Sequence, residues 1–202
     1  MLSKKKYAIY GGTFDPVHMA HIILADIAVK EIGLDELIFM PAYISPFKQD
    51  TPTSSGENRY NMITKILNFN PAFRVSDYEF TLKSPSYTIN TLEYFDDLDY
   101  NKLYFLLGFD SLMEIESWHR GTDILIKFPL LTGYRPGTVK NDVISKIEYF
   151  REKYNAEINV LDMPPLDISA TDIRRRILNG YSIKGLVHPK VEEYIFDNKL
   201  YQ

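Results

Sequence analysis

The chain has 202 residues, of which 45% are hydrophobic, enough to bury the core of one α/β domain. It has no cysteine, which excludes disulfides, thiolate metal sites and a cysteine nucleophile and predicts a cytoplasmic location. The net charge of −4, from 23 Lys+Arg and 27 Asp+Glu, argues against a nucleic-acid polymer as partner. The apolar stretch after the basic run 4–6 is too short for a signal peptide, and no run approaches the roughly 20 apolar residues of a membrane-spanning helix.

Predicted strands and helices alternate along the chain. Short apolar runs predict strands at 7–10, 37–40, 73–78, 102–107, 129–133 and 157–161. Helical periodicity predicts helices at 19–32, 58–68, 88–95, 141–154, 169–179 and 191–197, with Gly33 ending the first. The first helix is expected to pack through one face formed by Ala20, Leu24, Ile27 and Ala28.

This order of elements predicts one domain over 1–202. Its core, 1–161, is expected to be a doubly wound, Rossmann-like parallel sheet with helices on both faces. A small C-terminal helical part, 162–202, is expected to follow it. Ligands of such sheets bind beyond the carboxyl ends of the strands, so the loops after the strands are the expected site.

The turn after the first predicted strand reads GGTFDPVHMAH. Gly11 and Gly12 leave the backbone bare, so that a ligand can approach its amides, and Asp15 with the following proline fixes a turn. His18 and His21 are three residues apart at the start of a helix, and therefore lie on one face near its partially positive end. This combination indicates a site for the α- and β-phosphates of a nucleotide.

Other interpretations of this turn fit its residues less well than phosphate binding does. The two histidines could coordinate a metal together with Asp15, but no third and fourth ligand is evident nearby, so no metal site is expected. They could also merely cap and pack, which would not explain two glycines, a turn and two histidines in succession. The Walker motif GxxxxGK[ST] and the dinucleotide motif GxGxxG are both absent.

The turn resembles the G-[GS]-[TS]-F-D-P-x-H-x-G-H signature of the nucleotidylyltransferase superfamily. The further motifs described below narrow the resemblance to the bacterial nicotinate-nucleotide adenylyltransferases, over nearly the whole chain. The resemblance implies that His18 and His21 are catalytic residues at the α/β-phosphate region. It also implies ATP contacts at Gly11, Gly12, Thr13 and Phe14.

A second motif, ISATDIR, is similar to the family's I-S-S-T-x-I-R. Ser169 is a good N-cap and Asp172, three residues on, fits a capping box. The resemblance adds ATP-binding roles for Ser169 and Thr171 and a catalytic role for Arg174. The next two arginines, Arg175 and Arg176, point away from Arg174 by the helical period and are expected to face solvent.

Three shorter matches also concern ATP. Lys48, in Pro-Phe-Lys, resembles the lysine of the family's P-P-H-K and is implied to be catalytic. Gly108 and Asp110 match a G-x-D that lies against adenosine, and Arg135 matches an R-P-G motif. An exposed loop lysine and an ordinary strand-end turn are the plain alternatives for these matches.

Two further matches resemble the part of the family's site that binds nicotinate mononucleotide, the molecule that accepts the nucleotidyl group. The segment SPSYT, with Tyr87 and Thr88, precedes a predicted helix, and Trp118 with His119 resembles the family's W-[YH] pair. In relatives the tryptophan stacks on the pyridine ring, and backbone amides hold the nicotinate carboxylate. A carboxylate suits the amides of a helix start better than an uncharged carboxamide does. Without the other motifs, the only tryptophan would be taken for a core or rim aromatic.

The resemblance implies transfer of AMP from ATP to nicotinate mononucleotide, giving nicotinic acid adenine dinucleotide (deamido-NAD) and pyrophosphate, with Mg²⁺ held mainly by the phosphates. A sister transferase acting on nicotinamide mononucleotide or phosphopantetheine, and a nucleotide-binding protein without turnover, are the alternatives. A homo-oligomer is compatible with the sequence. The chain departs from the family at Phe47, which replaces a histidine, at Ala20 and at Ala170.

Overall fold

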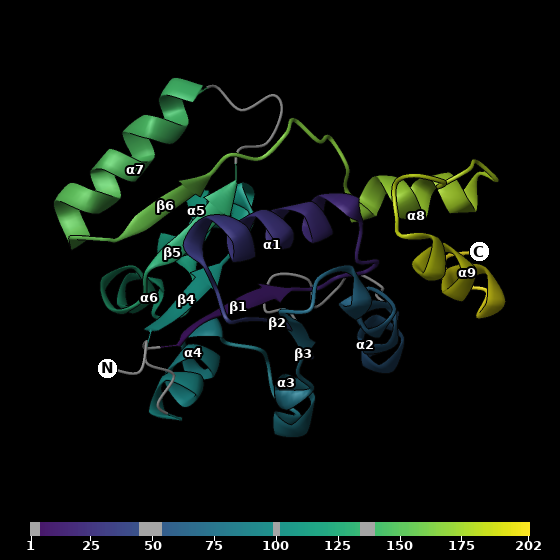
Figure 1. Cartoon of the computed structure of the whole chain (residues 1–202), viewed down its shortest axis with the longest axis horizontal. Coiled ribbons are helices and arrows are strands. Elements are labelled where there is room, and N and C mark those ends of the chain that lie inside the picture. Colours follow the sequence, from purple (N-terminus) through teal and green to yellow (C-terminus); the bar gives the residue numbers. More distant parts are fainter. Residues whose placement is uncertain (1–4, 45–53, 99–101, 134–139) are drawn as a thin grey trace.

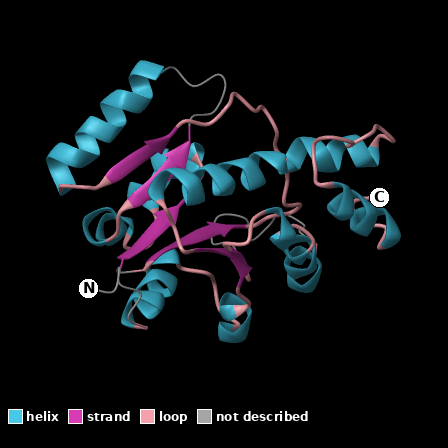
Figure 2. Cartoon of the chain, in the orientation of Figure 1, coloured by secondary structure: helices cyan, strands magenta, loops and turns pink. Residues whose placement is uncertain are grey.

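The computed structural model describes residues 5–44, 54–98, 102–133 and 140–202. Six parallel strands in this part form one sheet: β1 (Lys6–Gly12), β2 (Glu36–Pro41), β3 (Phe73–Val75), β4 (Lys102–Leu106), β5 (Leu130–Gly133) and β6 (Ile158–Leu161). Their order is β3-β2-β1-β4-β5-β6, so the chain runs outward from β1 and then restarts beside it with β4 (Figure 1). Figure 2 draws the strands as magenta arrows among the cyan helices. The predicted doubly wound parallel sheet is confirmed, and its topological switch point lies between β1 and β4.

Helices connect the strands and cover both faces of the sheet (Figure 1). The α-helices are α1 (Met19–Ile32), α2 (Gly56–Thr64), α3 (Tyr78–Leu82), α4 (Thr88–Asp97), α5 (Phe109–Glu114), α6 (Gly121–Lys127), α7 (Lys140–Tyr154), α8 (Ala170–Leu178) and α9 (Pro189–Asp197). Two short 3-10 helices are η1 (Leu67–Phe69) and η2 (Ile115–Ser117). None of the helices in the described residues is both long and apolar enough to cross a membrane.

Two hydrophobic cores lie on opposite faces of the sheet. Successive residues of β1 pack into opposite cores. Ala8 and Tyr10 pack with α1, while Ile9 packs toward α4 and α7. Helices α8 and α9 contribute to the same core as α1, for example through Ile173 and Val191. The C-terminal helices are thereby held against the strand ends of β1 and β2.

Helix α1 has the predicted bounds, and Gly33 ends it in a left-handed conformation with φ 68°. Its buried face differs from the predicted one. Leu24 and Ala28 are buried as expected and Ile27 packs partly buried against the same core, but Ile22 and Ala25 are buried in place of Ala20. Ala20 is instead turned toward the strand ends, where it lines a cavity described below.

Three predictions of local structure were wrong. The strand predicted at 73–78 ends at Val75, because Ser76 and Asp77 form a turn in which the Ser76 hydroxyl accepts the amide of Tyr78 and α3 begins. The helix predicted at 58–68 ends at Thr64 and continues only as η1. Helices α5 and α6 were not predicted, since they have only 6 and 7 residues and show too few turns for a periodic pattern.

Candidate active site

A cavity of about 630 Å³ opens at the carboxyl ends of β1 and β4, where the topology predicts a ligand. Elements from both halves of the sheet line it. Predicted residues that line the cavity are Gly11, Gly12, Thr13, Phe14, His18, His21, Thr88, Gly108, Asp110, Trp118, Ser169, Thr171 and Arg174. The structure thus gathers most of the predicted donor and acceptor residues around one space.

His18 and His21 lie side by side at the start of α1. Their rings stack with centroids 3.6 Å apart at an interplanar angle of 22°, which confirms the shared face predicted from their spacing. His18 is the N-cap residue and only 5% exposed, whereas His21 is half-buried. The His18 amide donates to Nδ1 of His21 at 3.2 Å, so a neutral His21 carries its proton on Nε2. Nε2–H is therefore the donor that His21 can offer a ligand.

The two glycines of the turn are required by neighbouring aromatic rings. A Cβ on Gly12 would lie 2.9 Å from Cζ of Phe14, and one on Gly11 would lie 3.2 Å from Cε2 of Phe105. Phe14 is buried, adopts a φ of 52° and packs its ring against His21 with centroids 5.1 Å apart. The Phe14 ring thus packs against the His21 ring, and the missing side chain of Gly12 leaves space for the Phe14 ring.

We expect Gly12→Ala to lower the free energy of unfolding by about 1–3 kcal/mol, because the added methyl group displaces the Phe14 ring. Gly108→Ala is the matched control, since a Cβ there meets nothing within 4 Å and its φ of −66° suits alanine. Urea denaturation of the two variants provides the measurement. Equal stabilities would show that the ring contact does not explain the glycine.

The starts of α1 and α8, both at the cavity, differ in the backbone donors that they offer. At α1 the Met19 amide donates to the carbonyl of Leu186 at 2.9 Å, so fewer helix-terminal amides are available there than the sequence suggested. At α8 the Ser169 hydroxyl accepts the amide of Asp172, which confirms the predicted N-cap. The first amides of α8, at Ala170 and Thr171, have no partner within the helix and lie at the cavity wall. This helix start is the better anion-binding end.

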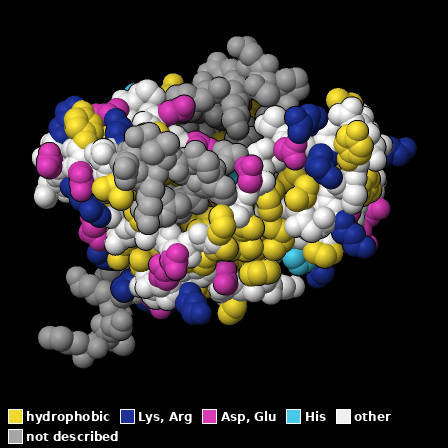
Figure 3. All heavy atoms as spheres, turned by 90° about the horizontal axis from the view of Figure 1, so that it is seen from above, with side chains coloured by type: hydrophobic (Ala, Val, Ile, Leu, Met, Phe, Trp, Pro, Cys, Tyr) yellow, Lys and Arg dark blue, Asp and Glu magenta, His cyan; other side chains and the backbone are white. Residues whose placement is uncertain are grey.

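Asp172 does not complete the predicted capping box through its carboxylate, which pairs with Arg175. Arg175 is exposed as predicted, whereas Arg176 is half-buried and donates from Nε to the carbonyl of Ser182 at 2.9 Å. Lys and Arg side chains of the α8–α9 end are visible in Figure 3, on the side where Figure 1 places these helices.

Arg174 joins α8 to the first turn. Its Nη1 donates to the carbonyl of Asp15 at 2.6 Å and its Nη2 to Oγ1 of Thr171 at 3.3 Å. The Asp15 carboxylate is 2% exposed and accepts hydrogen bonds from Ser54 and from the hydroxyl of Tyr201, the latter at 2.6 Å. Tyr201, the second-last residue of the chain, therefore anchors the turn that leads to His18.

The acceptor residues divide into two groups. Thr88 begins α4 and Trp118 follows η2, and both line the cavity. Tyr87 and His119 are exposed and contact each other with ring centroids 4.5 Å apart, but neither lines the cavity. Trp118 is held by a tight turn in which the Gly121 amide donates to its carbonyl at 3.0 Å.

Of the remaining predicted residues, two lie at the cavity and the others fall outside the described residues. Gly108 caps α5 and Asp110 lies in its first turn, and both are exposed at the cavity. Lys48, Phe47 and Arg135 lie outside the described residues. Their roles stay predictions from the resemblance.

Four residues that organise the site were not predicted from the sequence: Ser54, Arg59, Glu79 and Tyr201. Arg59 and Glu79 are buried charges, and Glu79 lines the cavity and accepts the Thr91 hydroxyl at 2.7 Å. Burial raises the pKa of Glu79, opposed by hydrogen bonds from Ser86 and Thr91. A signal for Arg59 does exist, because it lies three and four residues before Met62 and Ile63, on the buried face of α2.

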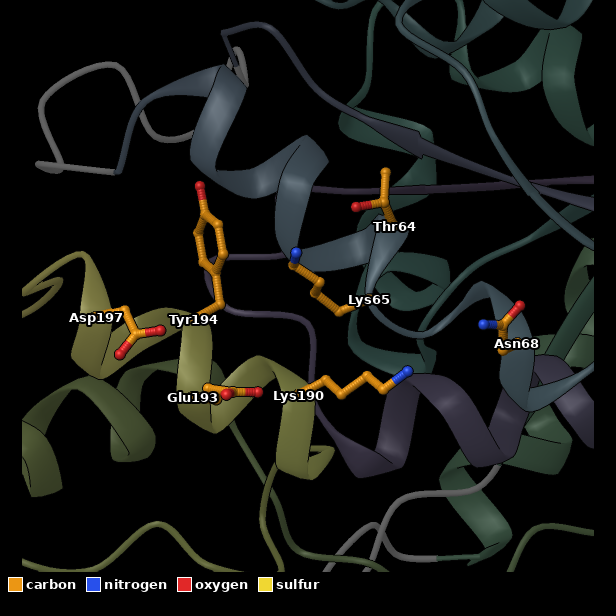
Figure 4. A pocket seen from close by; sticks show the side chains of 7 residues that line it. All are labelled: Thr64, Lys65, Asn68, Lys190, Glu193, Tyr194 and Asp197. Atoms are coloured by element: carbon orange, nitrogen blue, oxygen red, sulfur yellow. The ribbon is translucent and has the colours of Figure 1, made fainter.

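The described residues contain no group of three or more His, Asp or Glu side chains placed to hold a metal ion. A second, smaller cavity of about 370 Å³ lies between α2 and α9, away from the strand ends (Figure 4). It is lined by Thr64, Lys65, Asn68, Lys190, Glu193, Tyr194 and Asp197. It shares no residue with the larger cavity.

A family model described as Cytidylyltransferase-like matches residues 9–176, which span β1 to α8 and include the first turn and the α8 motif. The chain belongs to the cytidylyltransferase-like family. Curated members named "Probable nicotinate-nucleotide adenylyltransferase" from Caldicellulosiruptor saccharolyticus and Clostridium botulinum are 42% and 40% identical to it. Both alignments cover 98% of this chain, and 99% and 98% of the relatives. Within the cytidylyltransferase-like family, the chain therefore belongs with the nicotinate-nucleotide adenylyltransferases.

A solved structure extends the likeness of this cytidylyltransferase-like chain to the fold. Plasmodium falciparum nicotinic acid mononucleotide adenylyltransferase, complexed with NaAD, matches with a TM-score of 0.79 at 23% identity. The match covers 98% of this chain and 97% of that one. At this identity the likeness shows a shared fold.

Proposed function

We propose that the chain transfers the AMP moiety of ATP to nicotinate mononucleotide, forming nicotinic acid adenine dinucleotide (NaAD) and releasing pyrophosphate. The observation that carries the proposal is that a single cavity collects the stacked His18 and His21, the start of α8, and Thr88 with Trp118. The family membership supports the same reaction. A single domain over 1–202, a cytoplasmic location and the absence of a nucleic-acid partner belong to the proposal, while a homo-oligomer is compatible with it.

The reaction is an in-line displacement at phosphorus. An oxygen of the acceptor's 5′-phosphate attacks the α-phosphorus of ATP, and the bond from that phosphorus to the oxygen bridging to the β-phosphate breaks. The attacking phosphate is already ionised near neutral pH, its second pKa being about 6, so no general base is required. Catalysis then consists of positioning the two phosphates and stabilising the charge on the equatorial and leaving oxygens.

The donor residues supply that stabilisation. His18 and His21 face the α/β-phosphate region, with Nε2–H of His21 as one donor. Among the described residues, Arg174 donates through two of its five N–H groups, to Asp15 and Thr171, and the others are proposed to bind the triphosphate. Lys48, on the loop after β2, is proposed to neutralise the migrating charge.

ATP enters this reaction as its Mg²⁺ complex, and we treat the ion as part of the substrate. The described residues form no carboxylate cluster that would bind the ion by itself. The buried Asp15 is already engaged by Ser54 and Tyr201. The phosphates are therefore proposed to be the main ligands of the ion.

The acceptor is proposed to bind between Trp118 and the start of α4. The partially positive end of this helix, at Thr88, favours the negative carboxylate of nicotinate over a neutral carboxamide. Stacking on Trp118 would hold the pyridine ring regardless of its substituent. Stacking on Trp118 would thus supply affinity for the pyridine ring, and the start of α4 would supply selectivity for the carboxylate.

The test is to incubate the protein with ATP, Mg²⁺ and, in separate reactions, nicotinate mononucleotide, nicotinamide mononucleotide or phosphopantetheine. We expect pyrophosphate release to be fastest with nicotinate mononucleotide and mass spectrometry to identify NaAD. Faster turnover with either other acceptor would assign the chain to a sister reaction. ATP binding without pyrophosphate release would indicate a protein that does not turn over.

A further inference from the structure

Arg59, on α2, is a buried guanidinium close to the cavity but not part of its lining. It is 2% exposed, and the hydrogen bonds that it donates among the described residues all reach backbone carbonyls. Nη1 donates to Thr13 at 3.1 Å and to Ala42 at 2.6 Å, while Nη2 donates to Tyr43 at 3.2 Å. Nε donates to Ser54 at 3.2 Å. One side chain thus fixes carbonyls from three separate loop segments.

One of these segments belongs to the ATP side of the cavity. Thr13 follows the two glycines and precedes Asp15 in the turn that ends at His18. Ser54 donates from its amide and hydroxyl to the Asp15 carboxylate, so the Nε contact secures the same turn a second time. The guanidinium therefore fixes the position of the turn that carries the histidines.

The other contacts lead to the acceptor side. The Tyr43 amide donates to Oγ of Ser86 at 2.9 Å, and the Ser86 amide donates to the carbonyl of Ile44 at 3.0 Å. Ser86 lines the cavity two residues before Thr88, where α4 begins. Through Tyr43, the position of Arg59 sets the position of the acceptor segment.

The surroundings hold the guanidinium in one place. Its carbon lies 5.7 Å from the ring centroid of Phe80, on α3. Burial lowers the pKa of Arg59, and the charges of Asp15, Tyr201 and Glu79 act in the opposite direction. A lysine could not replace it, because one ammonium cannot reach four carbonyls that lie in different directions.

We propose that Arg59 is a positioning residue that holds the ATP-binding turn and the acceptor segment in register for transfer. This inference rests on the proposed function. The two reactants are bound by different loops, and the attacking oxygen must meet the α-phosphorus in line. A misplacement of about 1 Å can cost about 100-fold in rate while each substrate still binds.

The test compares wild-type protein with Arg59→Lys, measuring kcat, the KM of each substrate and the binding of each nucleotide alone by calorimetry. We expect kcat to fall about 10- to 100-fold, while each dissociation constant changes by less than about 3-fold. Val143→Ala, a core truncation in α7 remote from these loops, is the control for lost stability and should keep its kcat per folded molecule.

The possible outcomes distinguish a failure of the proposed transfer reaction from a failure of the positioning role of Arg59. If wild-type protein forms no dinucleotide, the proposed function fails. If wild-type protein turns over and Arg59→Lys has the same kcat per folded molecule, the positioning role is overturned. Should Arg59→Lys not fold, Phe80→Leu loosens the guanidinium without burying an unpaired charge, and an unchanged kcat in that variant overturns the proposal equally.

Discussion

His21→Asn is expected to lower kcat by about 10²- to 10³-fold, the loss typical of removing one preorganised donor to developing charge. The asparagine Oδ1 can take the place of Nδ1 and accept the His18 amide, so the start of α1 keeps its hydrogen bond. The donor at Nε2 is lost. Steady-state kinetics and thermal unfolding of the variant together measure the effect, and we expect the unfolding temperature to change little.

His21→Gln is the matched variant, because its side-chain amide can present an N–H near the position of Nε2. We expect it to retain more activity than His21→Asn, although it supports the helix start less well. His18→Ala should lose activity to a similar extent as His21→Asn, since the two rings are stacked at the same wall. Near-normal kcat in both His18→Ala and His21→Asn would end the proposed role of the pair.

Trp118→Ala is expected to raise the KM for nicotinate mononucleotide by roughly 10- to 100-fold, because stacking of an aromatic base on a side chain contributes about 1–3 kcal/mol. The KM for ATP should change little, since Trp118 is proposed to contact the acceptor and not ATP. Initial rates at varied concentrations of each substrate separate the two effects.

Trp118→Phe controls for packing, because Trp118 also contacts Phe105, with ring centroids 6.3 Å apart. The phenylalanine should restore most of the acceptor affinity. An equal rise in the KM for both substrates in Trp118→Ala would instead indicate that the tryptophan supports the cavity as a whole.

The sequence was sufficient for the sheet, and most of the site residues predicted from it line the cavity. The strands could be predicted from short apolar runs, and the long helix α1 from its helical periodicity and from Gly33 at its end. Both signals lie within the element itself. The turn with His18 and His21 could be placed correctly because it follows a strand end, and such ends converge in a parallel sheet. The short helices α5 and α6 lack this kind of local signal.

The residues that hold the site together depend on long-range contacts. The hydroxyl of Tyr201 reaches Asp15 across 186 positions of sequence, and no local pattern near the C-terminus indicates this contact. Arg59 was open to prediction, because a cation on the apolar face of a helix needs a buried partner. The carbonyls that it would reach could be known only from the fold.

The position of the triphosphate is tested by a crystal structure with a non-hydrolysable ATP analogue and nicotinate mononucleotide bound together. We predict the triphosphate within hydrogen-bond distance of the His18 and His21 rings and of the first amides of α8, with the pyridine ring against Trp118. A triphosphate bound elsewhere, with both imidazoles out of contact with it, would contradict the account.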